Sequence, residues 1–266
     1  MFRNFPKELL VAVRITLVIA VLGGLIYPLV MLGISQVAFN NQANGGLISN
    51  PNGNGTVVGA SLVGECYYET KEVSGTPVFQ TTQYEGHTFY TVDPRYFQGR
   101  PSYTQTTVNG TVVVVPLSPP CESNNSQGSN LAPSNALLIE QVDTYAGYLH
   151  CVGVDTAGSF TAAQLQQAVT DPSVHCLSAG ATTTPIPVDL ATGDFTSYDP
   201  DISVAAALAQ VNMVAEARGL NPSKVHAVVE ANISGRILWI FGESDVDVLQ
   251  LNLAMNRAFG APPALG

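Results

Sequence analysis

Apolar residues are concentrated in one stretch near the beginning of the chain. From Ile15 to Ile34 there is no charged residue, and only Thr16, Tyr27 and Pro28 interrupt a run of Ile, Leu, Val, Ala, Gly and Met. An α-helix of this length spans roughly 30 Å, the thickness of the hydrocarbon layer of a membrane. The pattern therefore predicts a single transmembrane helix over residues 15–37, with Pro28 as a candidate kink.

Basic residues flank this run on one side only. Arg3, Lys7 and Arg14 precede it, and the next basic residue is Lys71. Because positive charge marks the cytoplasmic side, we expect residues 1–14 in the cytoplasm and the rest of the chain outside. Two alternatives stay open. A cleaved signal peptide usually has a shorter apolar core of about 7 to 15 residues, and a pilin-like packing helix would need a processing site with an early acidic residue.

Small residues occur within the predicted helix. Ala20 and Gly24 are four residues apart, and Gly23 and Gly33 are further small positions. Small side chains let a second helix approach the backbone closely, although glycine is in any case frequent in transmembrane helices. One helix forms no transport path by itself, so a transport function would belong to partner proteins.

The segment after the helix changes from linker to strand composition. Residues 38–58 are rich in Asn and Gly and predict an extended or mobile linker, and residues 59–63 a short strand. A region rich in Thr and Tyr up to Val92 predicts a β-hairpin element. The run over 106–115 is divided by Asn109-Gly110, a sequence typical of a two-residue hairpin turn.

Helical periodicity appears in the second half of the chain. It predicts helices over 133–149 and 161–169, followed by a longer helix over 204–218. Ser203 is a suitable N-cap for the long helix, and Gly219 is suited to follow its end.

The last part of the chain has the most regular pattern. Asn221-Pro222 predicts the start of a helix that continues to Asn232, a strand follows over 236–241, and the last helix runs from Asp245 or Asp247 to Ala258. The overall prediction is an α+β protein. A single N-terminal transmembrane helix is followed by an extracytoplasmic mixed α/β domain, residues 59–266, with β-hairpin insertions.

The predicted outer part is acidic and contains all the cysteines. From Ile15 onward there are 7 Lys and Arg against 19 Asp and Glu, which argues against binding to nucleic acid or to anionic lipid surfaces. The four cysteines are Cys66, Cys121, Cys151 and Cys176. Two disulfides are expected, and the sequence leaves all three pairings open. No two cysteines are close enough in sequence for a zinc motif, so no metal site is predicted.

Motifs of catalysis are missing from the sequence. It has no Gly-x-Ser-x-Gly elbow, no His-Glu-x-x-His helix, no phosphate-binding loop and no Asp-Lys-Thr-Gly phosphorylation sequence. The four His residues lie in unrelated contexts. Asp199 and Asp201 form a close carboxylate pair before the Ser203 cap, where a helix dipole favours negative charge. The residues by themselves therefore predict no catalytic centre.

Several stretches of the chain resemble one known family. They are Tyr96-Phe97-Gln98-Gly99-Arg100-Pro101-Ser102, Gly128-Ser129-Asn130-Leu131-Ala132-Pro133-Ser134-Asn135, Pro187-Val188-Asp189-Leu190-Ala191-Thr192, Asp199-Pro200-Asp201-Ile202-Ser203 with Ala205 to Gln210, Ala217-Arg218-Gly219-Leu220, and Val246-Asp247-Val248-Leu249-Gln250-Leu251-Asn252-Leu253. In their order, and with the helix before them, they resemble the KdpC family, whose members belong to the Kdp potassium-transporting P-type ATPase.

The chain also departs from the family pattern. The glycine-rich stretch that is typical of the family before Asp199-Pro200 is only partly present in Thr192 to Tyr198. Segments of about 65–91, 108–122 and 142–184 look longer than or unlike the usual sequence, and the four cysteines fall inside them. These segments are interpreted as insertions held by disulfides.

The resemblance implies a membrane subunit without catalytic residues or a cofactor of its own. Its partners would be a potassium-channel-like subunit and the P-type ATPase subunit of a high-affinity potassium uptake complex, which uses ATP and K+. The family is described as assisting ATP binding, and the nucleotide-contacting sequence corresponds to Ser126, Gly128, Ser129 and Asn130. A cap and turn leading into the next helix is the alternative for that stretch.

The resemblance also supplies candidate interface residues and leaves two other functions to compare. In addition to Ala20 and Gly24, the candidates are Arg100, Asn135, Asp199 and Gln210. The alternatives are a membrane-anchored extracellular enzyme, which would need clustered catalytic groups, and a surface structural or adhesion protein, which the long polar segments would suit.

Overall fold

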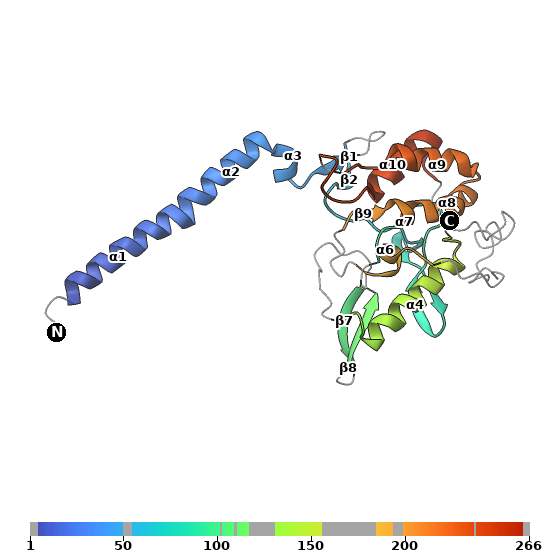
Figure 1. Ribbon diagram of the computed structural model, residues 1–266, viewed down its shortest axis with the longest axis horizontal. Coiled ribbons are helices and arrows are strands. Elements are labelled where there is room, and N and C mark those ends of the chain that lie inside the picture. Colours follow the sequence, from blue (N-terminus) through green and yellow to red (C-terminus); the bar gives the residue numbers. More distant parts are fainter. Residues whose placement is uncertain are drawn as a thin grey trace. The chain divides into compact units, whose positions relative to one another are not determined.

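The computed structural model describes residues 5–49, 55–101, 103–108, 111–116, 131–155, 185–193, 199–236 and 238–262. The chain forms two compact units, Met1–Ala60 and Ser61–Gly266 (Figure 1). The predicted mixture of helices and strands after one long apolar helix is present.

The first unit is dominated by the expected apolar helix. It consists of α1 (Phe5–Val21), a π-helical segment η1 (Leu22–Ile26) and α2 (Tyr27–Ala38). Residues Pro6–Ala38 form a helix that is long and apolar enough to cross a membrane, and none of its apolar window is buried inside the protein. The helix thus begins about ten residues before the apolar run that predicts it.

Pro28 explains the π-helical segment. Proline has no N–H to donate, and its ring clashes with the carbonyl four residues earlier, here that of Gly24. The helix widens at this point, and the N–H of Tyr27 donates to the carbonyl of Leu22, five residues back. An inserted π turn accommodates the proline within one continuous helix.

The predicted linker is partly ordered, which corrects the expectation for residues 38–58. It contains α3 (Asn40–Ala43), and β1 (Leu47–Ser49) pairs antiparallel with β2 (Val57–Ala60). The amide side chains of Gln36, Asn40 and Asn44 bond to one another at the helix end. Amide groups that we interpreted as typical of a mobile segment therefore bind Gln36 at the end of α2.

The second unit begins with hairpins. β3 (Thr70–Val73) pairs with β4 (Thr76–Phe79), and β5 (Thr81–Tyr84) pairs with β6 (His87–Tyr90). The turn residues Ser74-Gly75 and Glu85-Gly86 all have positive φ, as two-residue hairpin turns of type I′ require. β7 (Tyr103–Val108) pairs with β8 (Thr111–Pro116), and the predicted turn between them lies outside the described residues.

Four of the described helices of the second unit start at a residue whose polar side chain accepts a backbone N–H. α4 (Ala136–Cys151) begins after Asn135, three residues later than predicted, and α6 (Val188–Ala191) is a single turn. The caps predicted at Ser203 and Asn221 are confirmed, because each side chain accepts a backbone N–H at the start of a helix. Asp247, one of the two predicted starts of the last helix, caps that helix in the same way. These helices are α7 (Val204–Ala209), α9 (Pro222–Ala231) and α10 (Val248–Phe259).

The long helix predicted over 204–218 is wrong as one element. It divides at Gln210 into α7 and α8 (Val211–Ala217). The carbonyl of Ala209 accepts the N–H of Asp155 at 2.9 Å, so it leaves the helical pattern. A contact with a segment 54 positions away in sequence therefore sets the break.

The strand predicted over 236–241 is also wrong. Leu238 and Trp239 have positive φ in a turn, and the backbones of Ser234 and Asp245 pair with each other instead. The strand in this region is β10 (Asp245–Asp247), which pairs antiparallel with β9 (Asp201–Ser203). The helix predicted over 161–169 lies outside the described residues.

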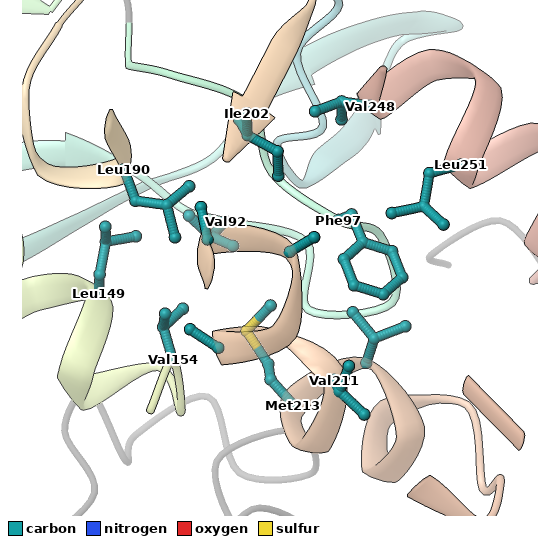
Figure 2. Close-up of a cluster of buried hydrophobic side chains, with 14 of the residues drawn as sticks. Val92, Phe97, Leu149, Val154, Leu190, Ile202, Val211, Met213, Val248 and Leu251 are labelled. Carbon is teal, nitrogen blue, oxygen red and sulfur yellow. The ribbon is translucent and has the colours of Figure 1, made fainter. Parts of the chain in front are cut away.

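The core of the second unit brings together side chains from β6, from α4 and from the elements between α6 and α10. Figure 2 shows Val92 on the side of Leu149, Val154 and Leu190, and Phe97 on the side of Leu251, all within one buried cluster. An aromatic group joins the hairpins to α4, and in it Phe89 stacks on Tyr148 with 5.1 Å between ring centroids. The segment from Val92 to Arg100 therefore crosses the middle of the core.

Candidate functional site

The side chain of Asn252 binds both the backbone N–H and the backbone carbonyl of Phe97. Its Oδ1 accepts the N–H of Phe97 at 2.9 Å, and its Nδ2 donates to the carbonyl of Phe97, also at 2.9 Å. Both residues are buried. A buried amide side chain thus takes the place of a neighbouring strand for this part of the Tyr96–Arg100 segment.

Gln210 does the same for the next residue of that segment. Its Oε1 accepts the N–H of Gln98 at 2.7 Å, and its Nε2 donates to the carbonyl of Gln98 at 3.1 Å. The same Nε2 also donates to the carbonyl of Ala206. Gln210 is fully buried where α7 meets α8, so the break between these helices places the side chain against the segment.

Two arginines hold the two ends of this segment. Arg218 donates from Nε to the carbonyl of Arg95 at 2.6 Å, and its guanidinium lies 5.2 Å from the centre of the Tyr96 ring. Arg100 donates from Nη1 to Oδ2 of Asp199 at 2.9 Å. The Arg100–Asp199 pair is partly exposed and joins the end of the segment to the start of β9.

Three further carboxylates lie near this ion pair on the β9 and β10 ladder. Asp201 is directly opposite Asp247, and Asp245 is opposite Ser203. Burial, together with the charges of Asp245, Asp247 and Asp199, raises the pKa of Asp201 to about 6. Burial also raises the pKa of Asp247, although the N–H groups at the start of α10 lower it. The paired strands β9 and β10 thus concentrate carboxyl groups beside the Arg100–Asp199 ion pair.

Comparisons with known proteins identify the family. The family model described as "K+-transporting ATPase, c chain" matches residues 9–257. A relative from Paraburkholderia xenovorans, named "Potassium-transporting ATPase KdpC subunit", is 32% identical over 96% of this chain and 97% of its own length. Relatives of the same name from Paraburkholderia phymatum (34% identical, covering 91% of this chain and 92% of theirs) and Rhodopseudomonas palustris (32%, covering 95% and 98%) match over similar lengths.

The chain belongs to the KdpC family. The resemblance stated from the sequence is therefore confirmed. The three relatives match the chain over nearly its whole length, so the apolar helix and the second unit are both parts of a KdpC protein.

The structure brings some of the predicted KdpC site residues together and separates others. Gln210 binds the backbone of the Tyr96–Arg100 segment, and Asp199 pairs with Arg100 at the end of that segment. Asn135 instead accepts the N–H of Leu137 as the N-cap of α4, which is a local role. Ala20 lies in α1 of the first unit, and Gly24 lies in its π-helical segment.

The predicted nucleotide residues Ser126, Gly128, Ser129 and Asn130 lie outside the described residues, as do Cys121 and Cys176. Cys66 and Cys151 are each disulfide-bonded. The pairing of the four cysteines stays a prediction.

Sequence reasoning missed two positioning residues of this KdpC chain, Asn252 and Arg218. Asn252 lies between Leu251 and Leu253 on a helix whose other inward residues are apolar. An amide side chain among the apolar inward positions of a helix is a signal that could have identified Asn252, because a buried amide needs hydrogen-bond partners. The side chains of Asn252, Gln210 and Arg218 thus hold the backbone of one segment that runs through the core and ends at Arg100.

Proposed function

We propose that this chain is the single-pass, non-catalytic accessory subunit of an ATP-driven potassium uptake complex. It assembles with a potassium-channel-like subunit and a P-type ATPase subunit, the partners that the family implies. The apolar helix Pro6–Ala38 is the observation that carries the proposal, because it is a surface suited to packing against transmembrane partners. The chain needs no cofactor of its own, and the complex uses ATP and K+.

The charge distribution supports an orientation with the N-terminus in the cytoplasm. Lys7 and Arg14 lie within α1, and the next basic residue is Lys71, in the second unit. The second unit then lies on the outer side of the membrane. Cys66 and Cys151, both disulfide-bonded, belong to this unit and suit an oxidising compartment.

This orientation favours assembly and coupling over direct ATP contact. ATP is in the cytoplasm, whereas residues Ser126 to Asn130 belong to the second unit. The chain therefore assists the ATPase subunit through the membrane and the outer face of the complex. A photoreactive ATP analogue is expected to label the P-type ATPase subunit of the purified complex and not this chain; labelling within residues 126–130 would favour the nucleotide alternative.

Topology and assembly are tested separately. An impermeant thiol reagent applied to intact cells is expected to label a cysteine introduced at Val73, on β3, and not one introduced at Glu8, on α1. Free native thiols are alkylated beforehand. The tagged chain, co-expressed with the two partner subunits from its own genome, is expected to co-purify with both and to support uptake at low external potassium. Labelling at Glu8 alone would reverse the orientation, and failure to co-purify would reject the assembly role.

A further inference from the structure

The second unit exposes four large apolar side chains in a row. Leu238 is 77%, Trp239 91%, Ile240 70% and Phe241 60% exposed. Single exposed apolar residues are ordinary on protein surfaces, but contiguous apolar patches mark interaction sites. We refer to residues 238–241 as the apolar loop.

The apolar loop is a shaped protrusion, because its base is closed by several contacts. Ser234 and Asp245 exchange two backbone hydrogen bonds of 2.9 and 3.3 Å. Arg236 forms an ion pair of 2.8 Å with Glu243 across the loop, and the N–H of Trp239 donates to the carbonyl of Arg236. Leu238 and Trp239 both have positive φ, a costly conformation for residues other than glycine. The chain thus maintains a strained turn that exposes these side chains.

Charge around the loop argues against a lipid surface and against a second copy. Glu243, Asp245 and Asp247 follow it closely, and Arg236 is already paired. Anionic lipid headgroups would be repelled by these carboxylates. Two copies of the chain joined through their loops would bring the same carboxylates together.

The size of the loop points to a partner that is already tethered to this chain. Trp239 and Phe241 together expose roughly 300 Å² of surface, since an aromatic side chain covers about 150–250 Å². A stable complex between free proteins needs about 800 Å² on each side. A smaller contact is sufficient when another contact raises the effective concentration of the two surfaces.

The membrane helix supplies such a tether. Only 22 residues separate its end at Ala38 from the start of the second unit at Ser61. At about 3.3–3.6 Å per residue they extend at most roughly 80 Å, which sets an upper limit on the distance between the second unit and the end of the helix. The proteins that pack on the helix are therefore the ones within reach of the loop.

We propose that the apolar loop docks into an apolar depression, bordered by basic side chains, on the outer face of a membrane subunit of the same pump. Trp239 is the central anchor, because tryptophan in a fully desolvated pocket is among the strongest contributors to protein interfaces. The acidic residues at the base of the loop face the basic border. This inference rests on the proposed function and adds to it the contact surface.

Trp239 gives a specific probe because it is the single tryptophan of the chain. The full chain labelled with 5-fluorotryptophan, placed in phosphatidylcholine nanodiscs, has one tryptophan ¹⁹F resonance from this protein. Its sensitivity to solvent, measured as the shift between H₂O and D₂O, is recorded alone and after assembly with unlabelled partner subunits. We expect full solvent exposure in the chain alone and protection in the complex.

Protection in the nanodisc without partners would instead indicate lipid contact, and protection that depends on the concentration of the chain alone would indicate self-association. Either result overturns the proposal, as does an exposed Trp239 in the assembled complex. If the wild-type chain does not assemble at all, the proposed function fails as well, which co-purification reports separately.

The same contact is tested by measuring how fast variants of Trp239 dissociate from the complex. Asn tolerates positive φ better than most residues, so Trp239→Asn removes the apolar side chain and suits the backbone. We expect this variant to dissociate from the detergent-solubilised complex at least about tenfold faster than wild type, and Trp239→Phe to recover part of the difference. The matched control is Val188→Gln on α6, a side chain 74% exposed elsewhere on the second unit. Equal dissociation rates for Trp239→Asn and the control would overturn the proposal.

Discussion

The side chain of Asn252 occupies both backbone hydrogen-bonding groups of Phe97, a residue 155 positions earlier in the chain. Both residues are almost completely buried, so neither group has water as an alternative partner. The arrangement joins the last helix of the fold to the segment that carries Arg100. Loss of this one amide therefore affects the core and the candidate interface together.

Replacing Asn252 with Leu keeps the branched shape of the side chain and leaves the N–H and carbonyl of Phe97 without the partners that Asn252 provides. We expect a loss of about 2–4 kcal/mol in the free energy of unfolding, because two buried polar groups become unpaired. Chemical denaturation of the full chain in detergent measures it. Arg257→Gln, at an exposed position of the same helix, is the control and is expected to change stability by less than about 0.5 kcal/mol. Equal stabilities of the two variants would contradict the role of Asn252.

Tyr148 connects α4 to the end of the hairpin region. Its hydroxyl accepts the N–H of Val92 at 3.0 Å and donates to the carbonyl of Tyr90 at 3.2 Å. Tyr148→Phe retains the stacking on Phe89 and is expected to cost about 1–3 kcal/mol, because the buried N–H of Val92 loses its partner.

Tyr90→Phe is the matched control for Tyr148→Phe, since the Tyr90 hydroxyl has no hydrogen-bond partner among the described residues. A loss of stability for Tyr90→Phe as large as for Tyr148→Phe would assign the effect to general packing. Thermal unfolding of both variants decides between the two.

Local signals predicted three helix starts of this fold, and long-range contacts decided much of what the sequence could not predict. Ser203, Asn221 and Asp247 act on backbone groups two or three residues away, so capping preferences are enough to find them. The break at Gln210 depends on Asp155, and the orientation of Gln210 depends on Gln98. No local pattern contains these partners.

The candidate site shows the same limit. The family resemblance identified Arg100, Asp199 and Gln210 as candidates. Only the tertiary structure shows that Arg100 binds Asp199 and that Gln210 binds the backbone of Gln98. The segment 236–241 has the composition of a strand, yet the side chains of Leu238 to Phe241 are exposed. β-propensity describes a fit to a half-buried sheet surface, and this segment lacks such a surface.

The carboxyl of Asp201 destabilises the fold when it is ionised. Its pKa is about 6 in the folded state, above its ordinary value of 3.8, so the folded chain binds the proton more tightly than the unfolded chain. Stability therefore falls as the pH rises from about 4 to about 6 and then stays lower. Asp201→Asn is expected to match wild type near pH 4 and to be more stable by about 1 kcal/mol at pH 7, a small value because solvent screens a half-exposed group.

Denaturation of Asp201→Asn at both pH values, with Glu72→Gln on β3 as the control for loss of one negative charge, measures this difference. A constant difference between variant and wild type at all pH values would exclude titration of Asp201 as its cause.

The four cysteines are expected to be oxidised in two disulfides. Cys66 and Cys151 are disulfide-bonded in the structure, and Cys151 is buried at the end of α4. Mass spectrometry after maleimide treatment is expected to show no added label on the unfolded, unreduced chain and four labels after reduction. Loss of one bond is expected to cost about 2–4 kcal/mol. Peptide mapping without reduction identifies the pairing, and labelling of the unreduced chain would contradict full oxidation.

The membrane helix is expected to hold the subunit in the complex through its small residues. The side chain of Ala20 and the position of Gly24 are open on the helix surface, and apart from its chain neighbours and the surrounding helix backbone no atom lies within 4 Å of a Cβ built at Gly24. Enlarging both to Leu moves a packed neighbouring helix away from the backbone, where association in membranes depends on close van der Waals contact. The double variant is expected to reach the membrane, to lose co-purification with the pump and to lose uptake at low potassium.

The control for this variant uses the other side of the same helix. Val18 lies two residues before Ala20, about 200° around the helix axis, so Val18→Leu adds bulk away from the proposed contact. It is expected to assemble as wild type does. If the Ala20→Leu, Gly24→Leu variant also assembles fully, the helix is not the principal contact, and the second unit must hold the subunit in place. The apolar loop and the surface around Arg100 are then the positions to change next, because one exposes the largest apolar side chains of that unit and the other carries an ion pair at the end of the Tyr96–Arg100 segment.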